Sequence, residues 1–349
     1  MRASIIIVSY NGRQYLEGCL SSLRSDMRDG EVIVVDNAST DGSVEWIQTH
    51  FPEVRLICNP RNRGFAAACN QGAEAARGEV LVFLNQDTRV APGWLASLVD
   101  VLEREEKVGL TTSKVLLMSH AGRIHLCGQD VHYTGLVFSR GFYLPESEFN
   151  HPEEVGAVSG ASFAIKRDVW EILGGFDEAF YMYYEETDLC WRAQLMGYRC
   201  RFVPGSVVDH DYQPGVTSTA RFYYATRNRV IMLLKNWGCA TLFLLIPVLL
   251  LTELVEVSMA ARQGWIGIHT KLRASFWILK HFTTVLRQRE AAQSLRSIPD
   301  SEILESRTGC LTPVETPTSL LLNLVLAPLN AIFRLYYRGI VAFYQLFRW

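Results

Sequence analysis

The chain of 349 residues is long enough for one large domain with an accessory region or for two modest domains. Its 34 Lys and Arg residues nearly balance 36 Asp and Glu residues, and the formal charge of −2 argues against a nucleic-acid partner. Eight scattered cysteines without a C-x-x-C pair favour a reduced, cytosolic compartment. The apolar run 4–8 is too short for a signal peptide, so we expect the chemistry to take place in the cytosol.

The N-terminal segment up to residue 87 alternates between short apolar runs and helical patterns. Strands are expected at 4–8, 32–35, 54–58 and 80–84, and helices at 15–23, 43–51 and 65–76. This alternation of nearly continuous apolar strands with helices predicts an α/β fold, a mostly parallel sheet covered by helices on both faces. The polar loops 9–12, 36–42 and 85–87 all follow strands, so they should converge on one cleft.

The alternation weakens after about residue 105. The segment 120–155 is rich in Gly, His and aromatic residues and is expected to form irregular loops with short antiparallel strands. Regular patterns return as a strand at 158–165, a helix at 168–173, a helix at 186–196 and a strand at 199–203.

From residue 221 onward the chain is helical and apolar. We expect apolar and basic helices that associate with a membrane at 221–286, a polar linker at 287–317 and an apolar helix at 318–349. The uncharged stretch 239–252 is shorter than the roughly 20 residues of a membrane span, and basic residues flank both of its ends. Helices that lie in the interface explain this pattern better than a single crossing, and a helical hairpin packed on the preceding domain is the alternative.

Carboxylates follow two of the predicted strands. Asp36 can accept hydrogen bonds from a nucleoside base or ribose, and Asp87 can hold Mg²⁺ or Mn²⁺. Both residues also suit an ordinary turn.

Further candidates lie nearer the middle of the chain. Glu185, Glu186 and Asp188 crowd the start of a predicted helix, where they suit the helix dipole or raise one another's pKa, which is useful in a general base. His210 is a candidate metal ligand, although a lone histidine is more often structural.

Taken in order, these motifs resemble the family 2 glycosyltransferases, especially their bacterial rhamnosyltransferase-like branch. The matching blocks are I-I-I-V-S-Y-N-G at 5–12, V-V-D-N-A-S-T-D-G-S at 34–43, N-R-G-F-A-A-A-C-N-Q-G at 62–72, F-L-N-Q-D at 83–87 and G-G-F-D-E-A-F-Y-M-Y-Y-E-E-T-D-L-C-W-R at 174–192. The resemblance implies a GT-A, Rossmann-like catalytic domain at 1–220, with a nucleotide-sugar half at about 1–105 and an acceptor half at about 106–220.

The resemblance also implies roles for individual residues. The residues that would surround or border the nucleotide sugar are Tyr10, Asn11, Asp36, Asn37, Arg63, Asn70 and Asn85. Asp87 and His210 would hold the metal. Asn85 stands where many members carry the first Asp of a D-x-D motif, which implies a single carboxylate ligand. Glu186 matches the general base, with Glu185 and Asp188 as substitutes.

The implied activity is inverting transfer of a sugar, with rhamnose favoured, from a nucleoside-diphosphate sugar to a lipid-linked or glycan acceptor. The enzyme would work in cell-envelope polysaccharide synthesis at the cytoplasmic face of the membrane, as a peripheral or monotopic protein or with one transmembrane span. Two alternatives stay open: a sugar-phosphate nucleotidyltransferase, and a non-catalytic membrane scaffold that only binds nucleotide. The loop 9–13 lacks the Gly-rich, basic character expected of the first alternative.

Overall fold

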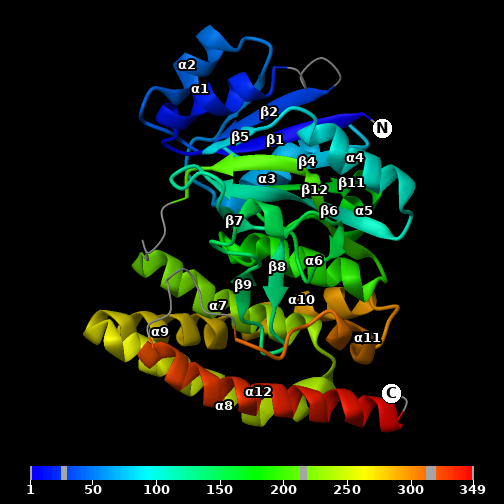
Figure 1. Cartoon of the computed structure of the whole chain (residues 1–349). Coiled ribbons are helices and arrows are strands. Elements are labelled where there is room, and N and C mark those ends of the chain that lie inside the picture. Colours follow the sequence, from blue (N-terminus) through cyan, green and yellow to red (C-terminus); the bar gives the residue numbers. More distant parts are fainter. Residues whose placement is uncertain (1, 25–29, 213–217, 312–319, 348–349) are drawn as a thin grey trace. The chain divides into compact units, whose positions relative to one another are not determined.

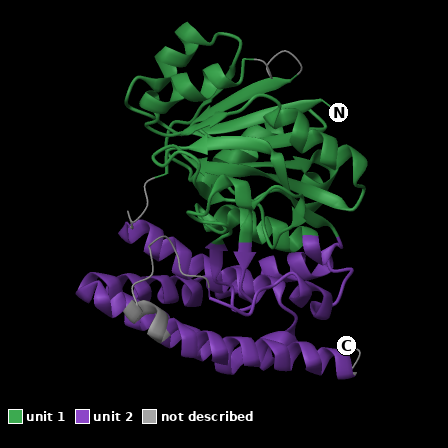
Figure 2. Ribbon diagram, viewed as in Figure 1, with its two compact units in different colours: residues 1–129, 139–193, 198–213 green, residues 130–138, 194–197, 214–349 purple. Residues whose placement is uncertain are grey.

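The computed structural model describes residues 2–24, 30–212, 218–311 and 320–347 (Figure 1). The chain divides into two compact units, which Figure 2 colours separately. Unit 1 comprises residues 1–129, 139–193 and 198–213, and unit 2 comprises residues 130–138, 194–197 and 214–349. The boundary expected at residue 220 therefore misses two short segments, 130–138 and 194–197, that belong to unit 2.

Unit 1 begins with the predicted alternation of strands and helices. These elements are β1 (Ala3–Ser9), α1 (Arg13–Ser22), β2 (Glu31–Asp36), α2 (Ser43–His50), β3 (Arg55–Cys58), α3 (Phe65–Ala75) and β4 (Val80–Asn85). The strands β1, β2, β3 and β4 pair in parallel. The register puts Ser9 opposite Asp36, and Val8 opposite Asn85, so the loops that follow these strands leave the sheet at the same edge.

The rest of unit 1 extends this sheet in a mixed arrangement. Its elements are β5 (Thr88–Val90), α4 (Trp94–Arg104), β6 (Val108–Leu117), β7 (Ile124–Leu126), β10 (Glu153–Glu154), β11 (Ser162–Lys166), α5 (Arg167–Leu173), α6 (Glu185–Leu195) and β12 (Arg199–His210). The order is β10-β12-β6-β11-β4-β1-β2-β3, with β11 antiparallel to both of its neighbours. Helix α4 and strand β6 are elements that the sequence patterns had not indicated.

Both faces of the sheet are covered, as predicted. Alternate residues of β1, Ile5 and Ile7, lie in a core with α1, α2 and α4. Ile6 faces the opposite side, where a Cβ on Gly72 of α3 would come within 2.5 Å of its Cγ2. Glycine is therefore required for α3 to lie this close to the sheet.

Unit 2 is largely helical. Its helices are α7 (Thr219–Asn236), α8 (Cys239–Arg262), α9 (Gly264–Lys280), α10 (Phe282–Ser294), α11 (Asp300–Glu305) and α12 (Leu320–Phe347). Strands β8 (Gln129–Val131) and β9 (Val137–Ser139) form a hairpin whose turn belongs to unit 2. Among the described helices, α8 is long and apolar enough to cross a membrane by length and composition.

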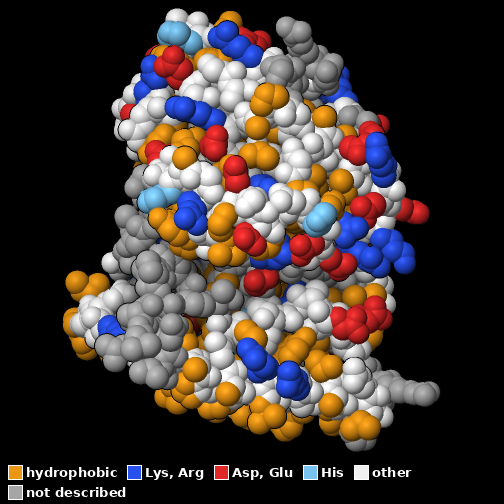
Figure 3. All heavy atoms as spheres, in the orientation of Figure 1, with side chains coloured by type: hydrophobic (Ala, Val, Ile, Leu, Met, Phe, Trp, Pro, Cys, Tyr) orange, Lys and Arg blue, Asp and Glu red, His pale blue; other side chains and the backbone are white. Residues whose placement is uncertain are grey.

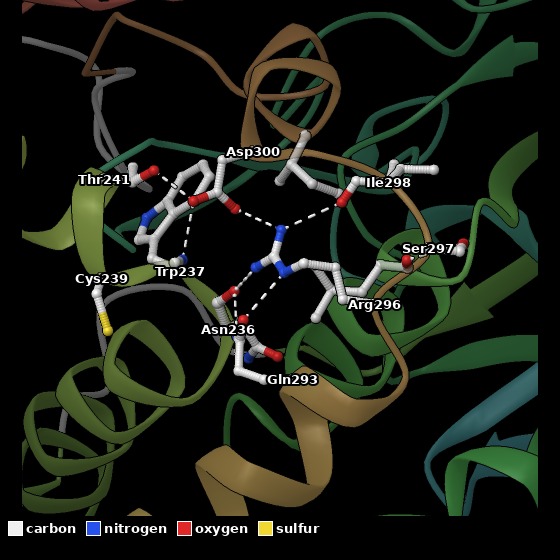
Figure 4. Close-up of polar contacts among 12 residues, drawn as sticks. Asn236, Trp237, Cys239, Thr241, Gln293, Arg296, Ser297, Ile298 and Asp300 are labelled. Atoms are coloured by element: carbon white, nitrogen blue, oxygen red, sulfur yellow. Dashed lines mark hydrogen bonds and ion pairs between the residues drawn. The ribbon is translucent and has the colours of Figure 1, made fainter. Parts of the chain in front are cut away.

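The expected polar linker at 287–317 is wrong for its described part, because α10 and α11 occupy much of it. Several of its polar side chains bond to the end of α7 (Figure 4). Arg296 donates to the carbonyl of Asn236 at 2.6 Å and to Asp300 at 2.6 Å, and Asp300 accepts from the backbone N–H of Gly238 at 2.8 Å. Residues 312–317 of the expected linker lie outside the described residues.

Candidate active site

The three polar loops of the sheet edge contact one another, as the sequence predicts. The backbone N–H of Asn11 donates to Ser39 Oγ at 2.9 Å, and Asn11 Oδ1 accepts from the N–H of Thr40 at 2.9 Å. The N–H of Tyr10 donates to Gln86 Oε1 at 3.1 Å. The side chain of Tyr10 remains largely exposed beside these loops. Side-chain to backbone bonds thus fix the loops relative to one another.

Asp36 and Asn37 close the second strand and are both buried. Asp36 Oδ2 accepts from the N–H of Ser39 at 2.9 Å, whereas its Oδ1 has no hydrogen-bond partner among the described residues. Asn37 uses its whole amide on the loop 59–64, donating to Asn62 and Gly64 and accepting from Asn59 and Arg63. Asn37 therefore holds the loop 59–64 in place, whereas Asp36 Oδ1 remains able to accept a hydrogen bond.

Arg63 and Asn70 differ in what they leave available. The Arg63 side chain is half exposed and its guanidinium lies 3.9 Å from Glu178, a weak surface contact. Asn70 donates to the carbonyl of Phe176 at 2.9 Å and accepts from the N–H of the same residue at 2.9 Å. Asn70 therefore holds the segment that leads towards α6, and its amide is occupied there.

Asp87 and His210 are adjacent. The register of β5 and β12 places His210 opposite Thr88, and His210 Nε2 lies 3.3 Å from Asp87 Oδ1. The other ring nitrogen of His210, Nδ1, lies 3.0 Å from Nδ1 of buried His125, which stacks on Tyr212 with ring centroids 4.0 Å apart. One of these two nitrogens must donate. If His210 donates, its Nε2 carries no proton and can bind a cation.

A cleft of about 290 Å³ opens beside Asp87. It is lined by Gln14, Tyr15, Asp87, Thr88, Arg89, Met118 and Asp211. Two ligand atoms in neighbouring positions around Mg²⁺, with bonds of about 2.1 Å, lie about 3 Å apart, which fits the separation of Asp87 and His210. The described residues contain no cluster of three or more His, Cys, Asp or Glu side chains placed for a metal ion. A cation here would depend on further oxygen ligands from a substrate or water.

Glu185 and Glu186 are buried at the start of α6. Burial raises the pKa of both carboxyls, and the charge of Glu186 raises the pKa of Glu185 further. A Cβ on Gly160 would lie 3.4 Å from Glu186 Oε1, and the carbonyl of the next residue, Ala161, accepts from the N–H of Asn85 at 3.0 Å. Glu186 therefore lies beside the loop 160–161, which bonds to Asn85 at the end of β4. Asn85 in turn precedes Asp87 by two residues.

Asp188, the third acidic candidate, is fully occupied. Its Oδ2 accepts from Arg192 Nε at 2.8 Å, and both residues are buried. Arg192 also donates to the carbonyls of Leu173 and Gly175. Because this ion pair holds α6 to the end of α5, Asp188 is poorly placed to replace Glu186 as a base.

The chain adopts an unusual conformation before α6. Tyr181, Tyr183 and Tyr184 have positive φ values of 65°, 67° and 73°, a region that costs non-glycine residues energy. Such outliers gather at functional sites, and here they precede Glu185 directly.

Sequence reasoning missed two side chains at this site. Gln129 donates to Glu186, and His125 contacts His210. Both lie in the segment 120–155, whose irregular sequence carries no periodicity that could indicate a role.

The sequence is similar to a known protein family and to individual members of it. Residues 4–173 match the model of the family described as "Glycosyl transferase family 2". An N-acetylglucosaminyl-diphospho-decaprenol L-rhamnosyltransferase of Mycobacterium tuberculosis is 27% identical over 232 residues, which cover 59% of this chain and 75% of that protein. The O-antigen biosynthesis protein RfbC of Myxococcus xanthus is 32% identical over 212 residues, covering 57% of this chain and 16% of that protein.

Solved structures share the fold. GalNAc-T7, in a crystal structure with UDP, GalNAc and Mn²⁺, aligns with a TM-score of 0.56 and 21% identity over 69% of this chain and 49% of that one. Residues 1–349 of TarS from S. aureus align with a TM-score of 0.51 and 15% identity over 99% of this chain and 92% of that one. These matches define the chain as a glycosyltransferase with the GT-A fold. Within this class the chain is similar to family 2 over residues 4–173 and to the L-rhamnosyltransferase of M. tuberculosis.

Proposed function

We propose that the chain transfers a sugar, with inversion, from a nucleoside-diphosphate sugar to a hydroxyl of a lipid-linked or polysaccharide acceptor in cell-envelope glycan synthesis. The observation that carries the proposal is the edge where Asp87 and His210 lie 3.3 Å apart, with buried Glu186 one short loop away. Rhamnose is the favoured sugar and a lipid diphosphate the favoured acceptor, because the M. tuberculosis relative is named as a rhamnosyltransferase that acts on a diphospho-decaprenol.

Asp87 and His210 would hold Mg²⁺ or Mn²⁺, and the GalNAc-T7 structure, which contains Mn²⁺ and UDP, supports such a cation. When bound, the cation would supply positive charge to the diphosphate of the donor. Asp36 Oδ1, buried and without a partner among the described residues, would accept a hydrogen bond from the base or ribose. Half-exposed Arg63 and exposed Tyr10 would border the nucleotide.

Glu186 would act as the general base. Burial raises its pKa, and a carboxylate with a raised pKa is a stronger base. The proton of the acceptor hydroxyl passes to the carboxylate while the oxygen forms a bond to the anomeric carbon. The bond from that carbon to the diphosphate oxygen breaks, and its electron pair leaves with the nucleoside diphosphate.

The direct test is Glu186→Gln in the full chain. We expect turnover to fall by roughly 10²–10⁴-fold, the range for loss of a general base, while binding of the nucleotide sugar persists. Binding is measured by thermal stabilisation against a panel of nucleotide sugars with Mg²⁺ or Mn²⁺, and turnover by acceptor-dependent release of nucleoside diphosphate. Exposed Glu106→Gln is the matched control. Near-normal turnover of the Glu186 variant would refute the assignment, and nucleotide binding without any release by the wild type would favour the scaffold.

We also propose that unit 2 attaches the enzyme to the cytoplasmic face of the membrane. Helix α8 exposes an apolar face along its length, and α9 and α12 expose further large apolar side chains (Figure 3). These residues are Phe243, Ile246, Leu250, Leu254 and Val257 on α8, Trp265, Ile266, Leu272, Phe276 and Leu279 on α9, and Ile332, Leu335, Phe343 and Leu346 on α12. Exposed apolar area of this extent is typical of an interaction surface.

The charges of unit 2 favour helices that lie in the membrane plane over a span. Glu256 of α8 accepts from Arg229 at 2.8 Å and from Lys271 at 2.6 Å, and the Arg229 side chain is only 1% exposed. If α8 crossed the bilayer, this cluster of charges would have to enter the hydrocarbon with it, and ionisable groups are costly there even when they pair with one another. In-plane attachment keeps the cluster inside the helical unit.

Flotation of the full chain with anionic phospholipid vesicles tests the attachment. The double variant Phe243→Asp/Leu254→Asp should lose roughly tenfold or more of the bound fraction, because both side chains lie on the exposed face of α8. Ile172→Asp, on an exposed apolar residue of α5, is the control. Thiol labelling of cysteines introduced at Phe243 and Met259 then distinguishes the two orientations. In-plane binding makes both accessible from one side of the vesicle, and a span makes them accessible from opposite sides.

A further inference from the structure

The carboxyl of Glu186 is held by two neighbours that the proposed reaction does not otherwise use. Gln129 Nε2 donates to Glu186 Oε1 at 2.9 Å, and Thr187 Oγ1 donates to Gln129 Oε1 at 2.9 Å. Because the Thr187 hydroxyl takes the carbonyl oxygen of the Gln129 amide, the NH₂ group of that amide must face Glu186. Gln129 is itself fixed by backbone hydrogen bonds in both directions with Ala157, at 2.8 and 3.2 Å.

The two carboxylate oxygens of Glu186 are therefore not equivalent. Oε1 accepts from Gln129, whereas Oε2 is buried and has no hydrogen-bond partner among the described residues. A buried carboxylate oxygen without a donor is costly, and such exceptions call for a functional explanation. The charge of Glu186 raises the pKa of two titratable groups, Glu185 on the same helix and Cys69 on α3, and neither group is a cation.

We propose that Gln129 is a positioning residue for the general base: it occupies Glu186 Oε1 and so reserves Oε2 for the proton of the acceptor hydroxyl. This inference rests on the proposed function of Glu186. In the transfer step the hydroxyl proton passes to Oε2 and the acceptor oxygen bonds to the anomeric carbon. The bond to the leaving diphosphate breaks, with its electron pair going to the diphosphate. Gln129 donates to the charged carboxylate throughout and exchanges no proton.

An N–H that donates to a carboxylate favours its charged form and lowers its pKa, which opposes the upward effect of burial. Removal of this donor should therefore raise the pKa of the base. A variant without the Gln129 amide would need a higher pH to reach the same fraction of ionised Glu186, while its affinity for the nucleotide sugar would not change.

The experiment is the pH profile of kcat/KM for Gln129→Met, which keeps the length of the side chain and removes its amide. We expect the acidic limb to move upward by about 1–2 pH units, so that the rate at a fixed pH on that limb falls roughly 10-fold or more, with recovery at higher pH and an unchanged KM for the donor sugar. The proposal is overturned if the acidic limb of the variant lies at the same pH as that of the wild type, or if kcat/KM falls by the same factor at every pH.

A second pair of variants covers the case in which Gln129→Met does not fold. Thr187→Val removes the hydroxyl that orients the amide and should shift the same limb by a smaller amount, whereas Thr187→Ser keeps the hydroxyl and should restore the wild-type profile. An identical profile for both variants contradicts the proposal. The failure of the base assignment is distinguishable, since Glu186→Gln would then keep its turnover. If Glu186→Gln is inactive and the limb stays in place, only the role of Gln129 is wrong.

Discussion

Two pairs of glutamates, one in each unit, meet opposite electrostatic surroundings. Glu185 and Glu186 of α6 are buried, and one oxygen of each has no hydrogen-bond partner among the described residues. Glu253 and Glu256 of α8 are half-buried and buried, and both are paired with cations of α7 and α9. The same type of side chain thus lies in unlike surroundings in the two units.

The pKa values follow this difference. Burial would raise the pKa of Glu253, but Arg229 and Lys271 outweigh burial and hold it below its ordinary value. In the first pair burial prevails and raises both pKa values. Carboxylates that pair with Arg or Lys stabilise a fold, whereas buried carboxyls without a neighbouring cation are typical of a functional site.

The largest expected effect comes from removing the arginine that pairs with Glu253 and Glu256 in unit 2. Arg229→Met leaves Glu253 and Glu256 with Lys271, and we expect a loss of about 3–5 kcal/mol in the free energy of unfolding at pH 7. A lowered carboxyl pKa gives stability that is present above its ordinary value of 4.5 and is lost as the pH falls through the lowered pKa. The loss in Arg229→Met should therefore be smaller near pH 4, as urea unfolding can measure.

Exposed Arg104→Met on α4 is the control for this variant and should change the unfolding free energy little. An Arg229→Met/Glu256→Leu double variant should regain part of the loss, since it removes a buried charge together with its partner. If Arg229→Met were as stable as the wild type, the contrast between the two pairs would not depend on charge compensation.

A smaller effect is expected when the proposed cation binds to unit 1. Mn²⁺ at 100 times its dissociation constant should stabilise the native chain by about 2.7 kcal/mol, which is several degrees in Tm. Asp87→Asn should abolish this rise, and exposed Asp100→Asn should keep it. His125→Phe should require roughly 10–100-fold more Mn²⁺, because it removes the partner of His210 Nδ1. An unchanged rise in Asp87→Asn means that the ion binds elsewhere.

The first half of the sheet and its edge were predictable because their signals are local. Apolar runs end at Ser9, Asp36 and Asn85, and parallel pairing alone brings those ends together. The contact between Asp87 and His210 depends on the antiparallel pairing of β5 with β12, which sequence patterns do not reveal, although family resemblance named both residues. Their role as metal ligands remains a prediction.

The polar composition of one segment of unit 2 led to a wrong prediction. Residues 287–317 were expected to form a polar linker, but in the described part of this segment Arg289 and Arg296 donate to carbonyls at the end of α7. A charged side chain that satisfies buried carbonyls is indistinguishable in sequence from one that faces water. Gln129 escaped notice for a related reason, since its partner Glu186 is far away in the chain and nothing local indicates the pairing.

The smallest effect tests the uncompensated pair itself. A raised carboxyl pKa means that the native chain loses stability as the pH rises from 4.5, the ordinary value, through the raised pKa of Glu185, because the buried group must then ionise. Glu185→Gln removes that loss, so its Tm should exceed that of the wild type by roughly 2–4 °C at pH 8 and converge with it near pH 5. Differential scanning calorimetry at the two pH values measures the difference, with exposed Glu106→Gln as the control. A Glu185→Gln variant that is less stable at pH 8 would show that the ionised carboxylate has a partner that stabilises it, and the contrast with Glu253 and Glu256 would disappear.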